Sequence, residues 1–292
     1  MANGSNGGIG LIVMNNCKEL GQKVDAWIKE IRGEDPNSPS YIIPTEEVRF
    51  SNGEGKVRIL DSVRGKDLYI VSDVGNYHCT YKMFGYENHI GPDEHFQDIK
   101  RVISAIGGKA NRITLIMPLL YASRQHRRKG RESLDCAMAL EELRNLGVDT
   151  IITFDAHDPT IHNAIPGTSF ENVLPTYSIL KNFIAIEGDD IFKDNMTVIS
   201  PDNGAMERAI YYANVLGLDV GMFYKRRDHS RIVNGKNPIV QHEYIGGPLD
   251  GKKVLIIDDM IASGTSLLKV AAHLKETKEG IFRDLDQRIS AR

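Results

Sequence analysis

The sequence is poor in the features that mark secreted, membrane and zinc-binding proteins. Its 292 residues include three cysteines, Cys17, Cys79 and Cys136, and an odd number of widely spaced cysteines argues against a disulfide framework and a CxxC zinc site. No apolar run approaches the roughly 20 residues of a membrane helix. The opening MANGSNGGIGLIVMNN lacks the basic region of a signal peptide. A cytoplasmic protein with no membrane partner is expected.

An excess of charge of one sign is also lacking. Lys and Arg number 36 against 39 Asp and Glu, which gives a formal net charge of -3. Without a global basic excess we expect no nucleic-acid partner, so any site for an anion must be local. Hydrophobic residues make up 41% and charged residues 26%, which is the balance of a globular protein and not of a disordered one.

Short apolar runs alternate with longer amphipathic segments along most of the chain. This alternation predicts α/β architecture with parallel sheets of the doubly wound kind. Strands are expected at residues 8–14, 67–72, 112–117, 149–154, 196–200, 219–224 and 253–257, and helices at 18–32, 94–106, 133–146, 205–216 and 266–275.

The length suggests one large domain or two of ordinary size. We expect two, residues 1–172 and 173–292, with the boundary in the Pro-containing stretch 166–175. Residues 83–92 are expected to form a polar, glycine-containing loop. In the helix at 18–32, the apolar residues that share one face are Leu20, Val24, Trp27, Ile28 and Ile31.

The most informative segment follows the expected strand at 253–257. Asp258 and Asp259 stand at the strand end, where two adjacent acids are costly unless a cation or hydroxyl donor satisfies them. The small residues 263–266 follow, and free amides at a helix N-terminus bind phosphate. Because ligands of open α/β sheets bind beyond the C-terminal strand ends, this loop suits a phosphorylated sugar. An ordinary turn capped by Asp is the alternative, but a cap needs only one acid.

Other polar groups also follow expected strands. Residues 124–131 hold five cations in eight residues, a concentrated anion site if it is not simply a solvated basic loop. Asp155 and His157 follow the strand at 149–154. Asp202 follows the strand at 196–200, where it could equally cap a helix. Lys225 and Arg227 follow the strand at 219–224, where an exposed charged turn is the simpler interpretation.

Taken in order, these segments resemble the ribose-phosphate pyrophosphokinase family. The similar family segments are FSNxE for residues 49–55 (RFSNGEG), YARQ for 121–125 (YASRQ, with the extra residue Ser123), D-L-H-A for 154–158 (FDAHD), S-P-D-x-G for 200–204 (SPDNG), and the phosphoribosyl pyrophosphate loop for 258–266 (DDMIASGTS). The loop departs from the family at Ala262, where an acid is usual. An acid there would be a potential partner for a ribose hydroxyl.

The resemblance implies two similar doubly wound domains of the phosphoribosyltransferase type. It implies that ATP donates its pyrophosphoryl group to the 1-hydroxyl of ribose 5-phosphate, in the service of nucleotide biosynthesis. By the same resemblance Phe50, Asn52 and Glu54 contact adenine from a neighbouring subunit, and Arg124 and Gln125 contact the nucleotide.

The resemblance also implies Mg²⁺, with Asp155, His157 and Asp202 as candidate metal residues; Asp202 is alternatively a contact of ribose 5-phosphate. The remaining implied contacts of ribose 5-phosphate are Asp258, Asp259, Ser263, Gly264, Thr265 and Ser266. Lys225 and Arg227 are the implied catalytic residues, because the family has a Lys and an Arg at this spacing at the start of a mobile lid. The resemblance implies a homo-oligomer, and a hexamer is the family expectation.

Two alternatives stay open. A non-catalytic regulatory homologue is favoured by Ala262 and by the C-terminus, because the family continues further and residues 279–292 do not have the pattern of the expected strand. The second domain is therefore expected to be shortened, and the sequence leaves open whether this is native. A phosphoribosyltransferase is favoured by the loop at 258–266 alone and disfavoured by the FSN and RQ segments.

Overall fold

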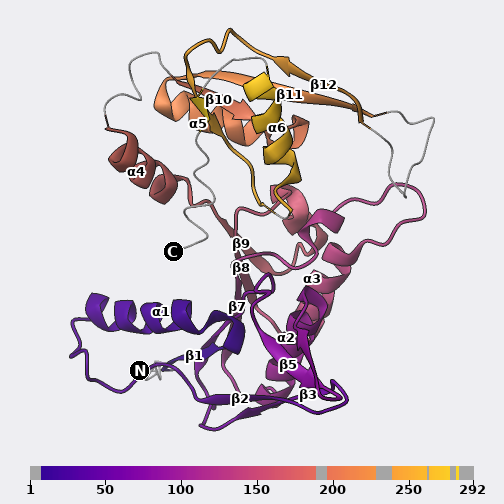
Figure 1. Ribbon diagram of the computed structural model, residues 1–292. Coiled ribbons are helices and arrows are strands. Elements are labelled where there is room, and N and C mark those ends of the chain that lie inside the picture. The colour runs from indigo at the N-terminus through magenta and orange to yellow at the C-terminus, as the bar shows by residue number, and fades with distance from the viewer. Residues whose placement is uncertain (1–7, 189–195, 228–238, 262, 277–280, 283–292) are drawn as a thin grey trace. The chain divides into compact units, whose positions relative to one another are not determined.

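The computed structural model describes residues 8–188, 196–227, 239–261, 263–276 and 281–282 (Figure 1). The chain divides into two compact units, Met1–Leu174 and Pro175–Arg292. The domain bounds expected from the sequence, with a boundary at 172/173, stay a prediction. Among the described residues, no helix is long and apolar enough to cross a membrane.

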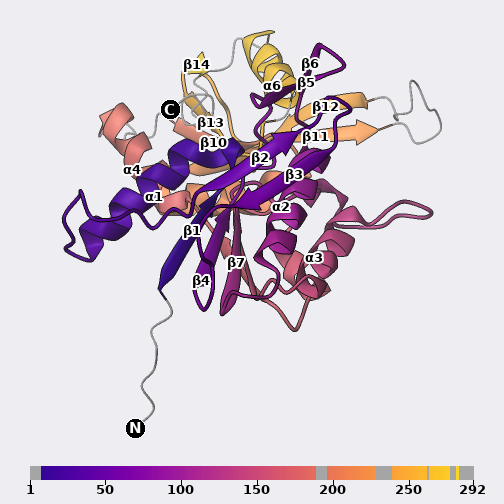
Figure 2. The same ribbon diagram turned by 90° about the horizontal axis from the view of Figure 1, so that it is seen from below.

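The first unit is built on a parallel sheet with the strand order β1-β4-β7-β8-β9; Figure 2 shows β1, β4 and β7 in this order. Its strands are β1 (Ile9–Val13), β4 (Asp67–Val71), β7 (Arg112–Met117), β8 (Thr150–Phe154) and β9 (Ser169–Val173). The helices are α1 (Lys18–Ile31), α2 (Pro92–Ile106) and α3 (Asp135–Asn145). Two antiparallel hairpins accompany the sheet, β2 (Thr45–Arg49) with β3 (Gly55–Ile59) and β5 (Thr80–Met83) with β6 (Tyr86–His89).

Helices cover both faces of this sheet. Successive residues of one strand point to opposite faces, so they pack against different helices. Ile12, Ile70 and Leu115 join the hydrophobic core that includes the buried faces of α2 and α3. Val13 points the other way, toward α1, where a Cβ added to Gly21 would lie 2.3 Å from Val13 Cγ1. The doubly wound arrangement predicted from the sequence is confirmed.

Helix α1 does not bury its apolar face. Its buried residues are Gly21, Asp25 and Lys29, and the last two form an ion pair at 3.3 Å. Trp27 is 68% exposed and Ile31 75% exposed. The face that a periodicity argument assigns to a core is therefore largely exposed, since the absence of a side chain at Gly21 lets the helix approach the sheet on another side.

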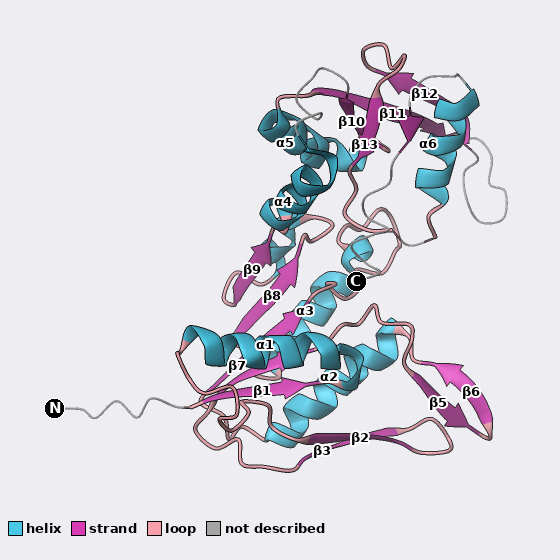
Figure 3. Cartoon of the chain, turned by 60° about the vertical axis from the view of Figure 1, so that its left-hand side comes forward, coloured by secondary structure: helices cyan, strands magenta, loops and turns pink. Residues whose placement is uncertain are grey.

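The second unit is built on a sheet with the order β12-β11-β10-β13-β14. Its strands are β10 (Met196–Ser200), β11 (Asp219–Arg227), β12 (Ile239–Ile245), β13 (Lys253–Ile256) and β14 (Ile281–Phe282). The β11–β12 pair is antiparallel, and the other pairs are parallel. The helices are α4 (Thr176–Glu187), α5 (Met206–Leu216) and α6 (Thr265–Glu276) (Figure 3).

This sheet also has a core on each face. Val198 packs with residues of α4 and α5, whereas its neighbour Ile199 packs with residues of α6. Helices on both faces of a mainly parallel sheet make the second unit, like the first, an α/β layer structure.

Some expectations for the regular structure are wrong. Residues 83–92 are not a plain loop, because they contain the turn and second strand of the β5–β6 hairpin. The strand expected at 219–224 continues to Arg227 and pairs with β12, which the sequence analysis missed. A short strand, β14, lies in the tail that did not have a strand pattern. Such short strands depend on pairing partners that are distant in sequence.

Candidate active site

In the first unit, the loops after β7 and β8 both contain a residue with a left-handed backbone. Ala122 has φ 53° and Asp155 has φ 45°. Left-handed φ is uncommon for residues other than glycine and concentrates at functional sites. Ala122 immediately precedes the short 3-10 helix Ser123–Gln125. It lies in segment 121–125 and Asp155 lies in segment 154–158, both of which were expected from the sequence to belong to the site.

The buried carboxylate of Asp158 joins these two loops. Its Oδ2 lies 3.1 Å from an Arg127 guanidinium nitrogen and 3.3 Å from His126 Nε2, both in the loop after β7. Its Oδ1 accepts hydrogen bonds from the backbone N–H (2.9 Å) and hydroxyl (2.6 Å) of Thr160. Burial raises the pKa of Asp158, but the hydrogen bonds from Thr160 and Arg127 outweigh it, so the pKa lies below its usual value.

Asp158 brings the expected nucleotide segment and the expected metal segment together. The rings of His126 and His157 meet edge to face with centroids 5.3 Å apart. Arg124 and Gln125 are exposed in the first loop, while Asp155 is half-buried and His157 exposed in the second. The sequence analysis did not select Asp158. Its signal was the Asp-Pro step, since its side chain caps the 3-10 helix Pro159–Ala164.

Phe50, Asn52 and Glu54 lie in the turn between β2 and β3. The turn is closed by the Phe50 N–H donating to Glu54 O at 2.8 Å. Asn52 Nδ2 donates to Glu54 Oε2 at 3.0 Å, so the two polar side chains hold each other. Phe50 is 47% exposed. The structure thus brings the three expected adenine residues into one turn, with the aromatic ring accessible.

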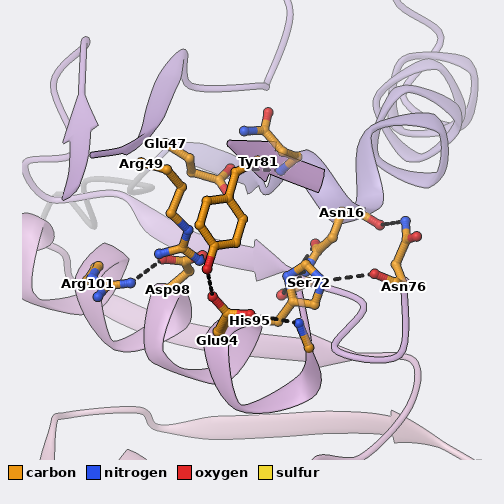
Figure 4. Close-up of polar contacts among 12 residues, drawn as sticks. Asn16, Glu47, Arg49, Ser72, Asn76, Tyr81, Glu94, His95, Asp98 and Arg101 are labelled. Carbon is orange, nitrogen blue, oxygen red and sulfur yellow. Dashed lines mark hydrogen bonds and ion pairs between the residues drawn. The ribbon is translucent and has the colours of Figure 1, made fainter. Parts of the chain in front are cut away.

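A buried ion-pair cluster attaches this hairpin to α2 (Figure 4). Asp98 bonds Arg49, the residue before Phe50, and accepts from an Arg101 guanidinium nitrogen at 2.6 Å. The side chains of Asp98 and Arg49 are 6% and 11% exposed. Tyr81 of β5 donates to Glu94 Oε1 at 2.9 Å. None of these groups was expected from the sequence, because the Arg49–Asp98 pair that holds the cluster joins segments far apart in the chain.

A second buried network in Figure 4 joins the ends of β1 and β4 to α2. Asn16 Nδ2 donates to Ser72 Oγ at 3.0 Å and lies 3.0 Å from His95 Nδ1. His95 Nε2 lies 2.9 Å from the carbonyl oxygen of Asn76. Since a carbonyl only accepts, Nε2 donates to Asn76, and Nδ1 faces the Asn16 amide.

In the second unit, three expected site carboxylates follow two neighbouring strands. Asp202 follows β10, and Asp258 and Asp259 follow β13, which pairs with β10 in parallel. Asp202 Oδ1 accepts from the Gly204 N–H at 3.0 Å, so it caps the 3-10 helix Asn203–Ala205, which is the capping role considered for it from the sequence. The pKa of Asp258 is raised to about 7 by burial, then by a hydrogen bond and the charge of Asp259, with a further contribution from the charge of Asp202.

The loop after these acids leads into α6. Gly264 has φ 69°, and the hydroxyls of Ser263 and Thr265 lie 2.8 Å apart. Thr265 begins α6, so the backbone amides of this segment lie at a helix N-terminus.

Several predicted residues lie outside the part of the chain that the structure describes. Ala262 is one of them. Lys225, Arg227 and Ser266 belong to β11 and α6 by their backbones, and their side chains lie outside the described residues.

The donor set suits a magnesium ion that a phosphorylated substrate helps to hold. Among the described residues, no group of three or more His, Cys, Asp or Glu side chains could hold a metal ion. Mg²⁺ is usually bound by one or two carboxylates together with waters and substrate phosphates. Asp202 after β10 and, in the first unit, the half-buried Asp155 therefore each offer carboxylate oxygen of the kind that such an ion takes.

Comparisons with known protein families agree with this arrangement. A model of the N-terminal domain of ribose phosphate pyrophosphokinase matches residues 9–147. A model of the phosphoribosyl transferase domain matches residues 169–279. Together the two matches include residues from both units and the site segments described above, except the loop after β8 with Asp155, His157 and Asp158, which lies between the two matched ranges.

Similar curated proteins carry one common name. A ribose-phosphate pyrophosphokinase of Chromobacterium violaceum is 29% identical over 231 residues, which are 78% of this chain and 62% of that protein. One of Vibrio cholerae is 30% identical over 232 residues, which are 78% of this chain and 65% of that protein. The chain thus spans less than two thirds of the length of these relatives.

A solved structure shares the fold. The phosphoribosylpyrophosphate synthetase of Mycobacterium smegmatis superimposes with a TM-score of 0.72 at 22% sequence identity, covering 95% of this chain and 79% of that one.

Proposed function

The chain belongs to the ribose-phosphate pyrophosphokinase family, and we propose that it transfers the pyrophosphoryl group of ATP to the 1-hydroxyl of ribose 5-phosphate. The products are phosphoribosyl pyrophosphate and AMP, which would feed nucleotide biosynthesis. The observation that carries the proposal is the group of carboxylates after β10 and β13 beside the N-terminus of α6. A phosphorylated sugar needs these two kinds of contact, because carboxylates accept from hydroxyls and amides donate to phosphate.

In the proposed reaction the 1-hydroxyl oxygen of ribose 5-phosphate attacks the β-phosphorus of ATP. The bond from that phosphorus to the oxygen bridging it to the α-phosphorus breaks, the hydroxyl proton is released, and AMP leaves. Asp258 and Asp259 hold the ribose hydroxyls, and the amides of residues 263–266 hold the 5-phosphate. Lys225 and Arg227 neutralise charge on the transferring group. Catalysis of this kind is mostly positioning and charge stabilisation.

The nucleotide contacts come from the first unit in this proposal. Phe50 stacks on adenine, and Asn52 and Glu54 bond its edge, across a subunit boundary of a homo-oligomer, by family expectation a hexamer. Arg124 and Gln125 bind the polyphosphate. Mg²⁺, when bound near Asp155, His157 or Asp202, supplies positive charge for the phosphate oxygens. The oligomer and the cytoplasmic location belong to this proposal.

A non-catalytic regulatory homologue is the second candidate, and Ala262 favours it. The residue stands where the family has an acid, so one potential partner of a ribose hydroxyl is lost. A phosphoribosyltransferase is less well supported, because the family model that matches residues 9–147 is that of the pyrophosphokinase.

The test is the formation of AMP and phosphoribosyl pyrophosphate from ATP, ribose 5-phosphate and Mg²⁺. Wild type is compared with Lys225→Ala and with Lys269→Ala, a matched loss of one exposed lysine on α6. We expect turnover that collapses in Lys225→Ala and survives in Lys269→Ala. A folded wild type that binds ATP without turnover would favour the regulatory homologue. Loss of phosphoribosyl pyrophosphate only in the presence of a nucleobase would favour the transferase.

A further inference from the structure

The turn of the β5–β6 hairpin has an unusual residue at its tip. Met83 pairs with Tyr86, which leaves Phe84 and Gly85 as a two-residue turn. Both have positive φ, 49° and 87°, as a type I′ turn requires. Asn-Gly or Asp-Gly is the favoured pair for this turn, since most side chains are strained in the left-handed region. A phenylalanine at the first position contradicts the local preference of the backbone.

This residue does not contribute to the hydrophobic core either. Phe84 is 72% exposed and Tyr86 is 77% exposed, so little apolar burial offsets the strain. A strained backbone conformation that no gain in burial offsets is typical of functional positions.

The tip of this hairpin lies against the turn that holds the expected adenine residues. The Phe84 N–H donates to the carbonyl oxygen of Ser51 at 2.8 Å. On the same side, a Cβ added to Gly53 would lie 2.9 Å from Met83 Sδ. Phe84 and Phe50 are therefore exposed aromatic residues on two turns in direct contact, although 34 positions separate them in the sequence.

Residues of the two hairpins next to these turns are held on α2, which supports the contact between the turns (Figure 4). Tyr81 of β5 donates to Glu94 of α2 at 2.9 Å, and the Arg49 guanidinium carbon lies 5.6 Å from the centre of the Tyr81 ring. Arg49 is in turn bonded to Asp98 of α2. Both hairpins are thus held on one helix within one unit, so the two turns keep their relative position.

We propose that Phe84 is a second aromatic contact of the nucleobase bound at the Phe50 turn. This proposal rests on the proposed function and extends its adenine site. A second exposed aromatic side chain on a turn that contacts the Phe50 turn offers the flat face of a purine a further stacking surface, and stacking on an aromatic side chain is a substantial part of base binding. The ligand is an adenine nucleotide, with ATP as the probe.

The decisive variant is Phe84→Asn, because it separates binding from folding. Asparagine suits the left-handed position before Gly85 better than phenylalanine does. The hairpin should therefore keep or gain stability while it loses the ring. Stacking of one base on one aromatic side chain corresponds to a factor of about 5 to 160 in affinity. We expect KM for ATP to rise by that factor, with kcat within twofold of wild type.

Two further variants make the comparison specific. Phe84→Tyr keeps a ring and should keep the wild-type KM. Tyr77→Ala removes an exposed aromatic side chain that stacks on His89, at the other end of the hairpin, with ring centroids 4.4 Å apart. It should leave KM for ATP unchanged.

The outcomes separate this inference from the proposed function. If Phe50→Ala raises KM for ATP and Phe84→Asn does not, the Phe84 contact is refuted and the function stands. A fall in kcat at unchanged KM also refutes it. If wild type shows no turnover, the proposed function fails, and equilibrium binding of ATP decides the inference: weaker binding by Phe84→Asn supports it, and equal binding overturns it. A wild type that neither reacts nor binds ATP overturns both.

Discussion

The buried carboxylate of Asp98 on α2 should contribute much more to stability than the exposed carboxylate of Glu46 on the β2–β3 hairpin, which Asp98 attaches to α2. Asp98 is 6% exposed and pairs with Arg49, which is 11% exposed, and with Arg101. Asp98→Asn removes the negative charge and leaves the buried Arg49 guanidinium without the carboxylate that it bonds. Breaking a buried pair in this way costs about 3–5 kcal/mol. We therefore expect the free energy of unfolding to fall by about that amount.

The matched control is Glu46→Gln. Glu46 lies on β2 and bonds Arg58 of β3, with the two side chains 42% and 55% exposed. An exposed pair of this kind contributes about 0–1 kcal/mol. Urea unfolding followed by far-ultraviolet circular dichroism would compare both variants with wild type at one pH and ionic strength.

The structure also predicts a functional effect of the same change. Asp98 joins β2 to α2, and the Phe50 turn follows β2 directly, so Asp98→Asn should raise KM for ATP under conditions where the variant remains folded. Glu46→Gln should not. Equal losses of stability in the two variants, both below about 1 kcal/mol, would refute the argument that burial sets the strength of the Asp98 pairs.

Three further predictions concern other parts of the two units. Gly21→Ala should destabilise the protein by about 1–3 kcal/mol, because the new Cβ would lie 2.3 Å from Val13 Cγ1; a gain in stability on urea unfolding would contradict the close packing of α1. The pKa of Asp258 is raised to about 7, so folding favours the protonated carboxyl group. The stability that this protonation adds to the folded protein is complete below the ordinary carboxyl pKa and is lost as the pH rises toward 7. Asp258→Asn should therefore melt at a higher temperature than wild type at pH 8, in the absence of metal, with a smaller difference at pH 5; a difference independent of pH would disprove this. Burial raises the pKa of Cys17 and of Cys136 to about 12 and also raises the pKa of Cys79. Because Cys79 is only half-buried and the other two thiols are buried, a maleimide at pH 8 should modify Cys79 alone in the native protein, and mass spectrometry would count the labels.

Much of the architecture could be predicted because its signal is local. The apolar runs at β1, β4, β7, β8, β10 and β13 and the amphipathic segments between them are visible in the sequence, and their alternation is enough for a doubly wound α/β class. The candidate site followed from the same reading, since polar residues directly after such strands meet at one edge of the sheet. Asp202, Asp258 and Asp259 illustrate this, because they follow strands that pair in the structure.

Other features were not predictable because they depend on neighbours distant in sequence. Val24, Trp27 and Ile31 have the spacing of a buried face, but the approach of Gly21 to Val13 turns other residues of α1 toward the sheet. The β5–β6 hairpin, by contrast, is a local feature, and residues 83–92 were expected to form a loop because the two-residue turn at Phe84 lacks the usual Asn-Gly pair.

The sequence by itself determined the class of fold, the order of the site segments and the chemistry they can offer, since each of these is written in neighbouring residues. Tertiary structure alone decided that Asp158 joins the loops after β7 and β8, that Asp98 holds the Phe50 hairpin on α2, and that Phe84 stands beside the Phe50 turn. The reason is physical. A buried ion pair or a contact between two turns depends on which distant segments folding brings together, and the hydrophobic periodicity within one segment does not predict which segments will meet.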